Sequence, residues 1–213
     1  MNFPPRATAI AVATLDAIAP PLLDRRQSRK LIGVGLVSHH FDDVGLLKLR
    51  LRTNAIGLLS SEDGLIDWLE DELTGCDLLV ADELSDTLTL LRSEVQVGRH
   101  LGLAGLVNAP AARFHDLSES CWHGGRKSFV NMCRSGDVTV RQDSVVDLRA
   151  CWMTSLTRPI RDHLANRAAA SWRVWASRKN GNDNPAIAEA LNKLDDWLAE
   201  CVAPSTACDL SAR

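Results

Sequence analysis

Residues 9–21 read AIAVATLDAIAPP, an apolar run with β-branched residues that stops abruptly at Asp16. This pattern predicts a buried β-strand. An apolar strand that delivers one carboxylate at its end is a common way to build a metal-dependent active site, because Mg²⁺ prefers hard oxygen ligands. In such a site the Asp usually has an acidic companion within two residues, whereas position 18 is Ile. Asp16 is therefore the first ligand of a catalytic centre, the remnant of one, or the point where a strand turns into a loop.

Three strand-like runs open the chain, at residues 8–15, 30–38 and 46–53. The third alternates Leu with Lys or Arg, which is the period of a half-buried strand. The polar stretch HHFDDVG, residues 39–45, predicts a turn between the second run and the third. We therefore expect these two strands to form an antiparallel hairpin.

The periodicity then becomes helical. In SSEDGLIDWLEDELTG, residues 60–75, Leu at i, i+4 and i+8 predicts a helix capped by Ser60 or Ser61. The apolar stretch CDLLVADE, residues 76–83, predicts a short strand. A second helix is expected in SDTLTLLRSEVQVG, residues 85–98, with Ser85 as its cap and Asp86 in its first turn.

The second half of the chain is mainly helical. Residues 106–117 are expected to hold one more short strand, which ends near His115 and Asp116, and residues 128–138 a short helix. A long helix is predicted over 157–178 and another over 185–202. Three strands followed by alternating helices and strands predict a mixed α/β fold, in the order of a ribonuclease-H-like sheet. We expect one domain over 1–178, a linker and C-terminal helix over 179–202, and a flexible tail over 203–213.

Composition narrows the class of protein. The chain has 213 residues, of which 46% are hydrophobic, so it can bury a proper core, and its net charge of −3 argues against wholesale cationic binding to nucleic acid. The charge is uneven, because residues 60–96 hold eleven acidic residues and one basic residue, whereas residues 126–179 hold eleven basic residues and four acidic ones. This split is typical of one acidic face and one basic face, and a basic face is suited to bind phosphates.

Cysteine spacing and hydropathy predict a cytoplasmic protein. The six cysteines lack CxxC spacing and suit reduced thiols better than a disulfide framework. No run approaches the roughly 20 apolar residues of a membrane span, so we expect no membrane partner. The first 19 residues faintly imitate a secretory signal, but Asp16 interrupts the pattern.

Four segments together resemble the DEDD family of 3′–5′ exonucleases, over roughly residues 8–178. VATLD, residues 12–16, is similar to the first motif of that family, and CDLLVADELSDTLTLL, residues 76–91, to the second. KSFVNMCRSGDV, residues 127–138, resembles the segment before the third motif, and the helix with DHLANRAAASWRVW, residues 162–175, stands where that motif would be. The resemblance implies a ribonuclease-H-like fold and two Mg²⁺ or Mn²⁺ ions, with Asp16 and Asp86 as ligands and His163 positioning the attacking water.

The sequence departs from the family at two ligand positions. The first motif of the family is Asp-x-Glu, and here Ile18 replaces the Glu. If His163 is the aromatic residue of the third motif, the final Asp falls at Arg167 or Ala168, and an Arg side chain cannot bind a metal. Asp162 lies more than one helical turn from that position. The resemblance therefore implies a degenerate site, in which Asp16 is a remnant rather than a working ligand.

Two classes of function remain open. The first is an exonuclease-like pseudoenzyme that binds or processes single-stranded DNA or RNA, with basic side chains at Arg126, Lys127, Arg167, Arg173 and Arg178. Any surviving activity would be a hydrolase reaction that removes 3′ nucleotides with Mg²⁺ or Mn²⁺. The alternative is a non-catalytic interaction or oligomerisation module, whose acidic and basic faces dock a protein partner or a second copy.

Overall fold

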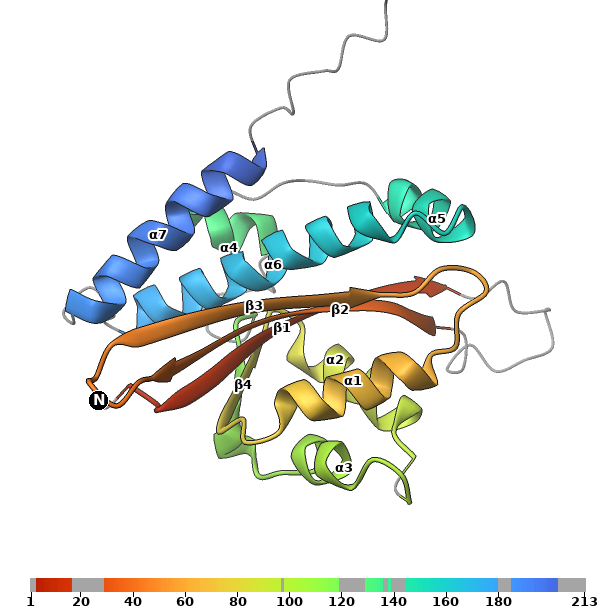
Figure 1. The fold of residues 1–213 in the computed structure, drawn as a ribbon, viewed down its shortest axis with the longest axis horizontal. Coiled ribbons are helices and arrows are strands. Elements are labelled where there is room, and N and C mark those ends of the chain that lie inside the picture. The colour runs from red at the N-terminus through yellow and green to blue at the C-terminus, as the bar shows by residue number, and fades with distance from the viewer. Residues whose placement is uncertain are drawn as a thin grey trace, which may run out of the picture.

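A five-stranded mixed β-sheet forms the middle layer of the protein (Figure 1). The computed structural model describes residues 3–16, 29–96, 98–118, 129–135, 138, 145–179 and 185–202. The strands are β1 (Arg6–Asp16), β2 (Arg29–Phe41), β3 (Leu47–Ala55), β4 (Leu78–Ala81) and β5 (Phe114–Asp116). Their order in the sheet is β3-β2-β1-β4-β5. Strand β2 is antiparallel to both β1 and β3, whereas β4 is parallel to β1 and to β5. The predicted α/β class and the predicted hairpin of the second and third strands are confirmed.

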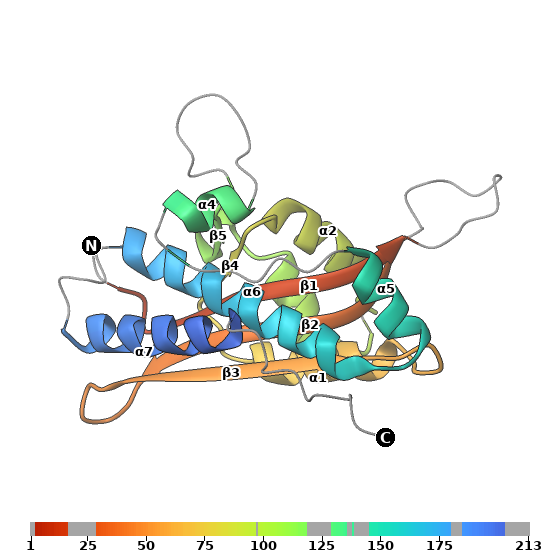
Figure 2. The same ribbon diagram turned by 90° about the horizontal axis from the view of Figure 1, so that it is seen from above.

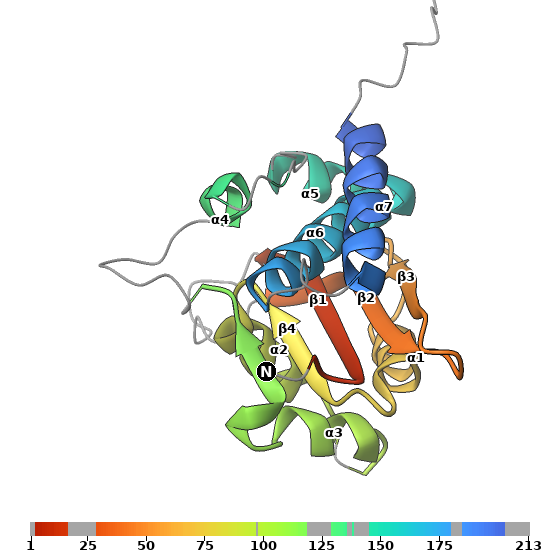
Figure 3. The same cartoon turned by 90° about the vertical axis from the view of Figure 1, so that its left-hand side faces the viewer.

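Helices cover both faces of this sheet (Figure 3). On one face lie α4 (Phe129–Ser135), α5 (Val145–Met153), α6 (Thr157–Arg178) and α7 (Pro185–Val202). On the other face lie α1 (Asp63–Leu73), α2 (Leu84–Glu94) and α3 (Leu101–Val107), and a short 3₁₀ turn at Ala111–Arg113 precedes β5. The long helix α6 runs obliquely over β1 and β2, as the view from above shows (Figure 2).

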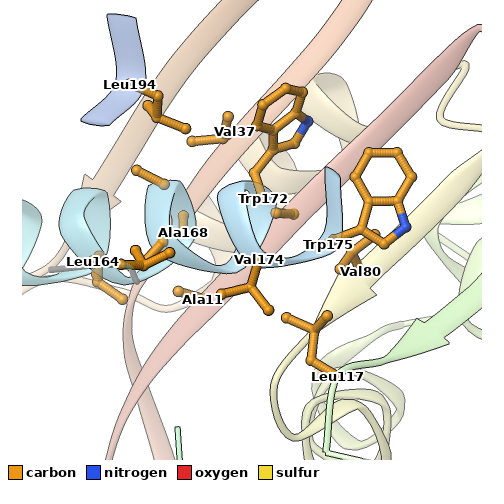
Figure 4. Close-up of a cluster of buried hydrophobic side chains, with 14 of the residues drawn as sticks. Ala11, Val37, Val80, Leu117, Leu164, Ala168, Trp172, Val174, Trp175 and Leu194 are labelled. Carbon is orange, nitrogen blue, oxygen red and sulfur yellow. The ribbon is translucent and has the colours of Figure 1, made fainter. Parts of the chain in front are cut away.

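Small residues let α6 lie directly on the sheet. Four successive alternate positions of β1 on the side of α6 are buried alanines, at Ala7, Ala9, Ala11 and Ala13, and only Leu15 at the end of the strand is larger. On β2, a Cβ added at Gly35 would lie 2.5 Å from the carbonyl oxygen of Leu164. Because such a contact is impossible, glycine is required where the helix crosses this strand. The apolar residues of α6 pack into the same core (Figure 4).

A buried aromatic cluster holds the C-terminal half of α6 against the sheet. Trp172 and Trp175 are both fully buried, which places them in the core and not on a surface where bases could stack. The Trp172 indole N–H donates to Nδ1 of His39 at 3.1 Å, and Nε2 of His39 donates to the carbonyl oxygen of Pro4 at 3.0 Å. The ring of His39 also stacks on Trp175, with centroids 5.7 Å apart. Burial lowers the pKa of His39 to about 4, so the ring is neutral at physiological pH.

The opposite face of the sheet holds a second core. The predicted helical stripe of α1 is confirmed, because Leu65, Leu69 and Leu73 are all buried. They pack with the buried leucines of α2 and α3 against Ile10, Leu36 and other residues of the sheet. The acidic residues of α1 fall largely outside this stripe.

Several local expectations are wrong in detail. Strand β2 extends to Phe41, so His39 and His40 lie in a strand and not in the predicted turn. Helices α1 and α2 begin at Asp63 and Leu84, after Glu62 and Glu83, and neither has a side-chain cap hydrogen bond. The residues at the cap positions are therefore acidic, which the helix dipole favours, although Oγ of the predicted Ser61 accepts a hydrogen bond from the amide of Asp63 at 3.2 Å. Helices α3 and α5 were not expected.

Helix α7 shares the core of the main domain. Its buried residues Ile187, Leu191, Leu194 and Leu198 belong to the same apolar cluster as α6. The expected tail at 203–213 lies outside the described residues. Among the residues that the structure does describe, no helix is long and apolar enough to cross a membrane.

Candidate functional site

A cavity of about 210 Å³ opens where β1 and β4 separate beneath α6. One wall is formed by Val12, Ala13 and Thr14 of β1, and the opposite wall by residues 82–87, from the end of β4 into α2. Helices α5 and α6 complete the lining, and Arg29 stands at the start of β2. Three carboxylates and three basic side chains therefore line one small space: Asp82, Glu83 and Asp86, and Arg29, His163 and Arg167.

Asp82 is the buried acid of this cavity. It directly follows β4, which is held on its other side by β5, and the amide of Leu117 donates to the Ala81 carbonyl oxygen at 2.8 Å. Strands β1 and β4 run in register, with Ala9 beside Val80. Two residues further along both strands come Ala11 and Asp82, so the carboxylate emerges next to an alanine. Asp82 is only 6% exposed.

The guanidinium of Arg167 neutralises this carboxylate. Its Nε donates to Oδ2 of Asp82 at 3.2 Å, and its Nη2 donates to the same oxygen. The aromatic ring of Phe129 packs against the guanidinium, with 4.9 Å between Cζ and the ring centroid. A charged pair that is shielded in this way interacts more strongly than a surface pair, and removing one partner leaves the other charge buried and uncompensated.

The surroundings of the pair on the α4 side are apolar. Cys133 is fully buried, and its pKa is raised to about 12, first by burial and then by the negative charge of Asp82. The thiol is therefore protonated at physiological pH, which disfavours a role as a nucleophile.

Two of the three predicted catalytic residues meet at this cavity. Asp86, in the first turn of α2, and His163, on α6, both line it together with Arg167. Asp86 is exposed and His163 is half-buried. The backbone of Asp16 pairs with Arg29 at the end of β1, but its side chain lies outside the described residues.

The three predicted nucleic-acid-binding cations that the structure describes each donate to an acceptor within the protein. Arg173 is committed to α7, since its Nε and Nη2 donate to the two carboxylate oxygens of Asp195 at 2.7 and 2.9 Å. Arg178 is exposed, and its Nη1 donates to the carbonyl oxygen of Leu117 at 3.3 Å. Arg167 is paired with Asp82, and Arg126 and Lys127 lie outside the described residues.

Among the described residues, the carboxylates of the cavity do not form a cluster that could hold metal ions. A two-metal centre needs several carboxylates around two ions. Here Asp82 is paired with a guanidinium, Glu83 and Asp86 are exposed, and the residues of β1 that line the cavity are Val, Ala and Thr. Within the part of the chain that the structure describes, no three His, Cys, Asp or Glu side chains are close enough to hold a metal ion.

Asp82 and Arg29 are the cavity residues that sequence reasoning missed. Asp82 stands in VADELSD, four residues before Asp86, and is the first polar residue after the apolar run of β4. A carboxylate at the end of a strand parallel to β1 was the signal that could have identified it. Arg29 had no such signal, because only the pairing of β1 with β2 brings it to the cavity.

Comparisons of the sequence with protein families and with characterised proteins found no match. The functional conclusion therefore rests on the geometry of the cavity and on the sequence motifs.

Proposed function

We propose that this chain is a ribonuclease-H-like domain, related in architecture to the DEDD exonucleases, that binds a nucleic-acid strand without cleaving it. In this proposal an ion pair between Asp82 and Arg167 stands where an active relative would hold metal ions.

The sheet supports the proposed fold family. Three antiparallel strands come first in the sequence, and two parallel strands follow beside β1, in the order β3-β2-β1-β4-β5. The cavity lies where β1, the end of β4 and α6 come together, which is where the resemblance implies the catalytic carboxylates. Asp86 and His163, two residues with implied roles, both line it.

The observation that carries the proposal is the Asp82–Arg167 ion pair. The resemblance implies a final metal-binding Asp at residue 167 or 168, and the chain has Arg167 there. Its guanidinium donates two N–H groups to Asp82, a deeply buried carboxylate of the cavity. A fixed cation in this place both satisfies Asp82 and repels a divalent ion. We therefore place no metal-assisted step in the function.

A role in binding is favoured by the basic groups around the cavity. Arg29 lines it and is exposed, and His163 lines it as well, whereas Arg167 is already paired with Asp82. Arg178 lies further along α6 and is exposed. A backbone phosphate can accept hydrogen bonds from such groups, and binding of this kind weakens steeply with salt.

A fluorescently labelled single-stranded oligonucleotide tests both parts of the proposal, which are binding of the strand and the lack of cleavage. Fluorescence anisotropy should show binding that weakens as NaCl is raised, and Arg29→Glu should weaken it further. Lys193→Glu is the matched control, because Lys193 is 73% exposed on α7, remote from the cavity. After incubation with Mg²⁺ or Mn²⁺, the strand should keep its full length. Absence of binding at low salt, or equal effects of the two variants, would refute the nucleic-acid role.

A second candidate function is an interaction module. The exposed apolar side chains at the end of β3 and before α6 favour it, because large aliphatic residues in solvent mark contact surfaces more often when they gather in one place.

A further inference from the structure

Four large aliphatic side chains gather in solvent at one end of the molecule. Leu58 and Leu59 follow β3 and are 44% and 95% exposed, and Met153 and Leu156 precede α6 and are 57% and 59% exposed. The loop from β3 to α1 lies beside the turn from α5 to α6 in two perpendicular views (Figures 1 and 2). We call these four residues the end patch.

The two segments that carry the end patch are tied together. The amide of Leu58 donates to the carbonyl oxygen of Trp152 at 3.2 Å. A Cβ added at Gly57 would lie 2.6 Å from Oγ of Ser155, so the two backbones touch where Gly57 permits it. The patch is therefore a defined surface formed by two packed segments.

The charges on the two sides of the end patch have opposite signs. On the α1 side stand Glu62 and Asp63, followed by an acidic helix. On the other side stand the exposed arginines Arg149, Arg158 and Arg161, with Asp147 and Asp162 among them. Within one copy, Glu62 is paired with Lys30 at 3.1 Å, whereas the contacts of Asp63 with Arg99 and of Arg158 with Asp162 are longer, at 3.8 and 3.9 Å. The patch thus sits at the seam between the acidic layer and the basic layer of the protein.

We propose that the end patch binds the end patch of a second copy of this chain, about a two-fold axis. In such an isologous contact, Leu58 and Leu59 of one copy pack on Met153 and Leu156 of the other. The same rotation brings the acidic side of each copy opposite the basic side of its partner. A surface of one charge, such as an anionic membrane, would match only one side of the patch, so the charge pattern favours a second copy. This contact is independent of the Asp82–Arg167 pair and of the nucleic-acid role.

Sedimentation velocity over a range of protein concentrations tests the contact. Wild-type protein should pass from monomer to dimer as its concentration rises, and added salt should shift it back toward monomer. Leu59→Glu should weaken the dimer by about tenfold or more, because one charged side chain is then buried without a partner. The side chain of Leu59 is in solvent in the monomer, so this variant should keep the fold.

Val44→Glu is the matched control. Val44 is 79% exposed in the turn that precedes β3, at the opposite end of that strand from the patch. It should dimerise as the wild type does. A wild-type monomer at all concentrations would overturn the proposal, as would equal weakening by Leu59→Glu and Val44→Glu. Flotation of a monomeric wild type with anionic phosphatidylserine vesicles, lost in Leu59→Glu, would assign the patch to a membrane and also overturn it.

Discussion

Oδ2 of Asp82 accepts hydrogen bonds from both Nε and Nη2 of Arg167, although the two residues are 85 positions apart in the sequence. The contact joins the end of β4 to the middle of α6 at the cavity. It supplies a permanent positive charge to a carboxylate that has almost no access to water. Such a pair is a structural element, and its removal has measurable consequences.

Loss of the arginine should destabilise the protein strongly. Arg167→Ala leaves Asp82 buried without a partner, and we expect the free energy of unfolding to fall by about 2–4 kcal/mol, discounted because the Arg167 side chain is 29% exposed. Urea denaturation at neutral pH measures this loss. Arg158→Ala is the control, since that side chain is 87% exposed and pairs with Asp162 at 3.9 Å, and it should change stability little. Equal effects would contradict the account of the pair. Asp82→Asn in the Arg167→Ala background should recover part of the loss.

Acid should destabilise the protein through His39. Because its pKa falls from 6.5 in the unfolded chain to about 4 in the fold, the unfolded state binds a proton first as the pH drops. The free energy of unfolding is unaffected by His39 above about pH 6.5. Between that pH and about pH 4 it falls by on the order of 3 kcal/mol. Urea denaturation at a series of pH values, compared with His39→Gln, isolates this effect. If the free energy of unfolding changed with pH equally in the wild type and in His39→Gln, His39 would not be the group that titrates.

Glu94 should have the opposite dependence. Burial and the neighbouring Glu62 carboxylate raise its pKa to about 6. The fold therefore favours the protonated acid, and the charged form opposes folding above that pH. We expect Glu94→Gln to raise the free energy of unfolding at pH 7 by about 1 kcal/mol, after a discount for partial exposure. The gain should vanish near pH 4, and a gain that persists there would contradict the electrostatic origin.

Because α6 lies so close to β2, we expect Gly35→Ala to destabilise the protein severely. The new Cβ would lie 2.5 Å from a backbone oxygen of α6, which cannot move alone. We expect a loss of several kcal/mol, on the order of 3 or more. Gly64→Ala is the control, because that position in α1 has open space and Ala is the better helix former. It should leave thermal stability unchanged or slightly raised, and a similar fall in Tm for both variants would count against the packing argument.

The sequence predicted those elements whose patterns are long and regular. The alternation of β3, the leucine stripe of α1 and the long apolar faces of α6 and α7 all gave the right element type. Helix α3 escaped prediction because its seven residues are too short to show a period. Acidic residues occupy both cap positions, although Ser61 still accepts a hydrogen bond from the first amide of α1.

The sequence predicted only some of the residues that line the cavity. Asp86 and His163 stand in recognisable motifs, and both line the cavity. Arg167 was noted as a cation at a ligand position, but its partner was not identified. The pairing of Asp82 with Arg167 could only be recognised once β4 was placed parallel to β1 and α6 was laid across both, because no local pattern links residues 85 positions apart in the sequence.

The central claim is that Arg167 stands in place of a metal ion. Titration of the wild-type protein with Mn²⁺, followed by the electron paramagnetic resonance signal of the free ion, tests it most directly. We predict no saturable site at the cavity, so that the wild type and Asp86→Asn give the same titration curve. One saturable Mn²⁺ site in the wild type that is lost in Asp86→Asn would contradict the account.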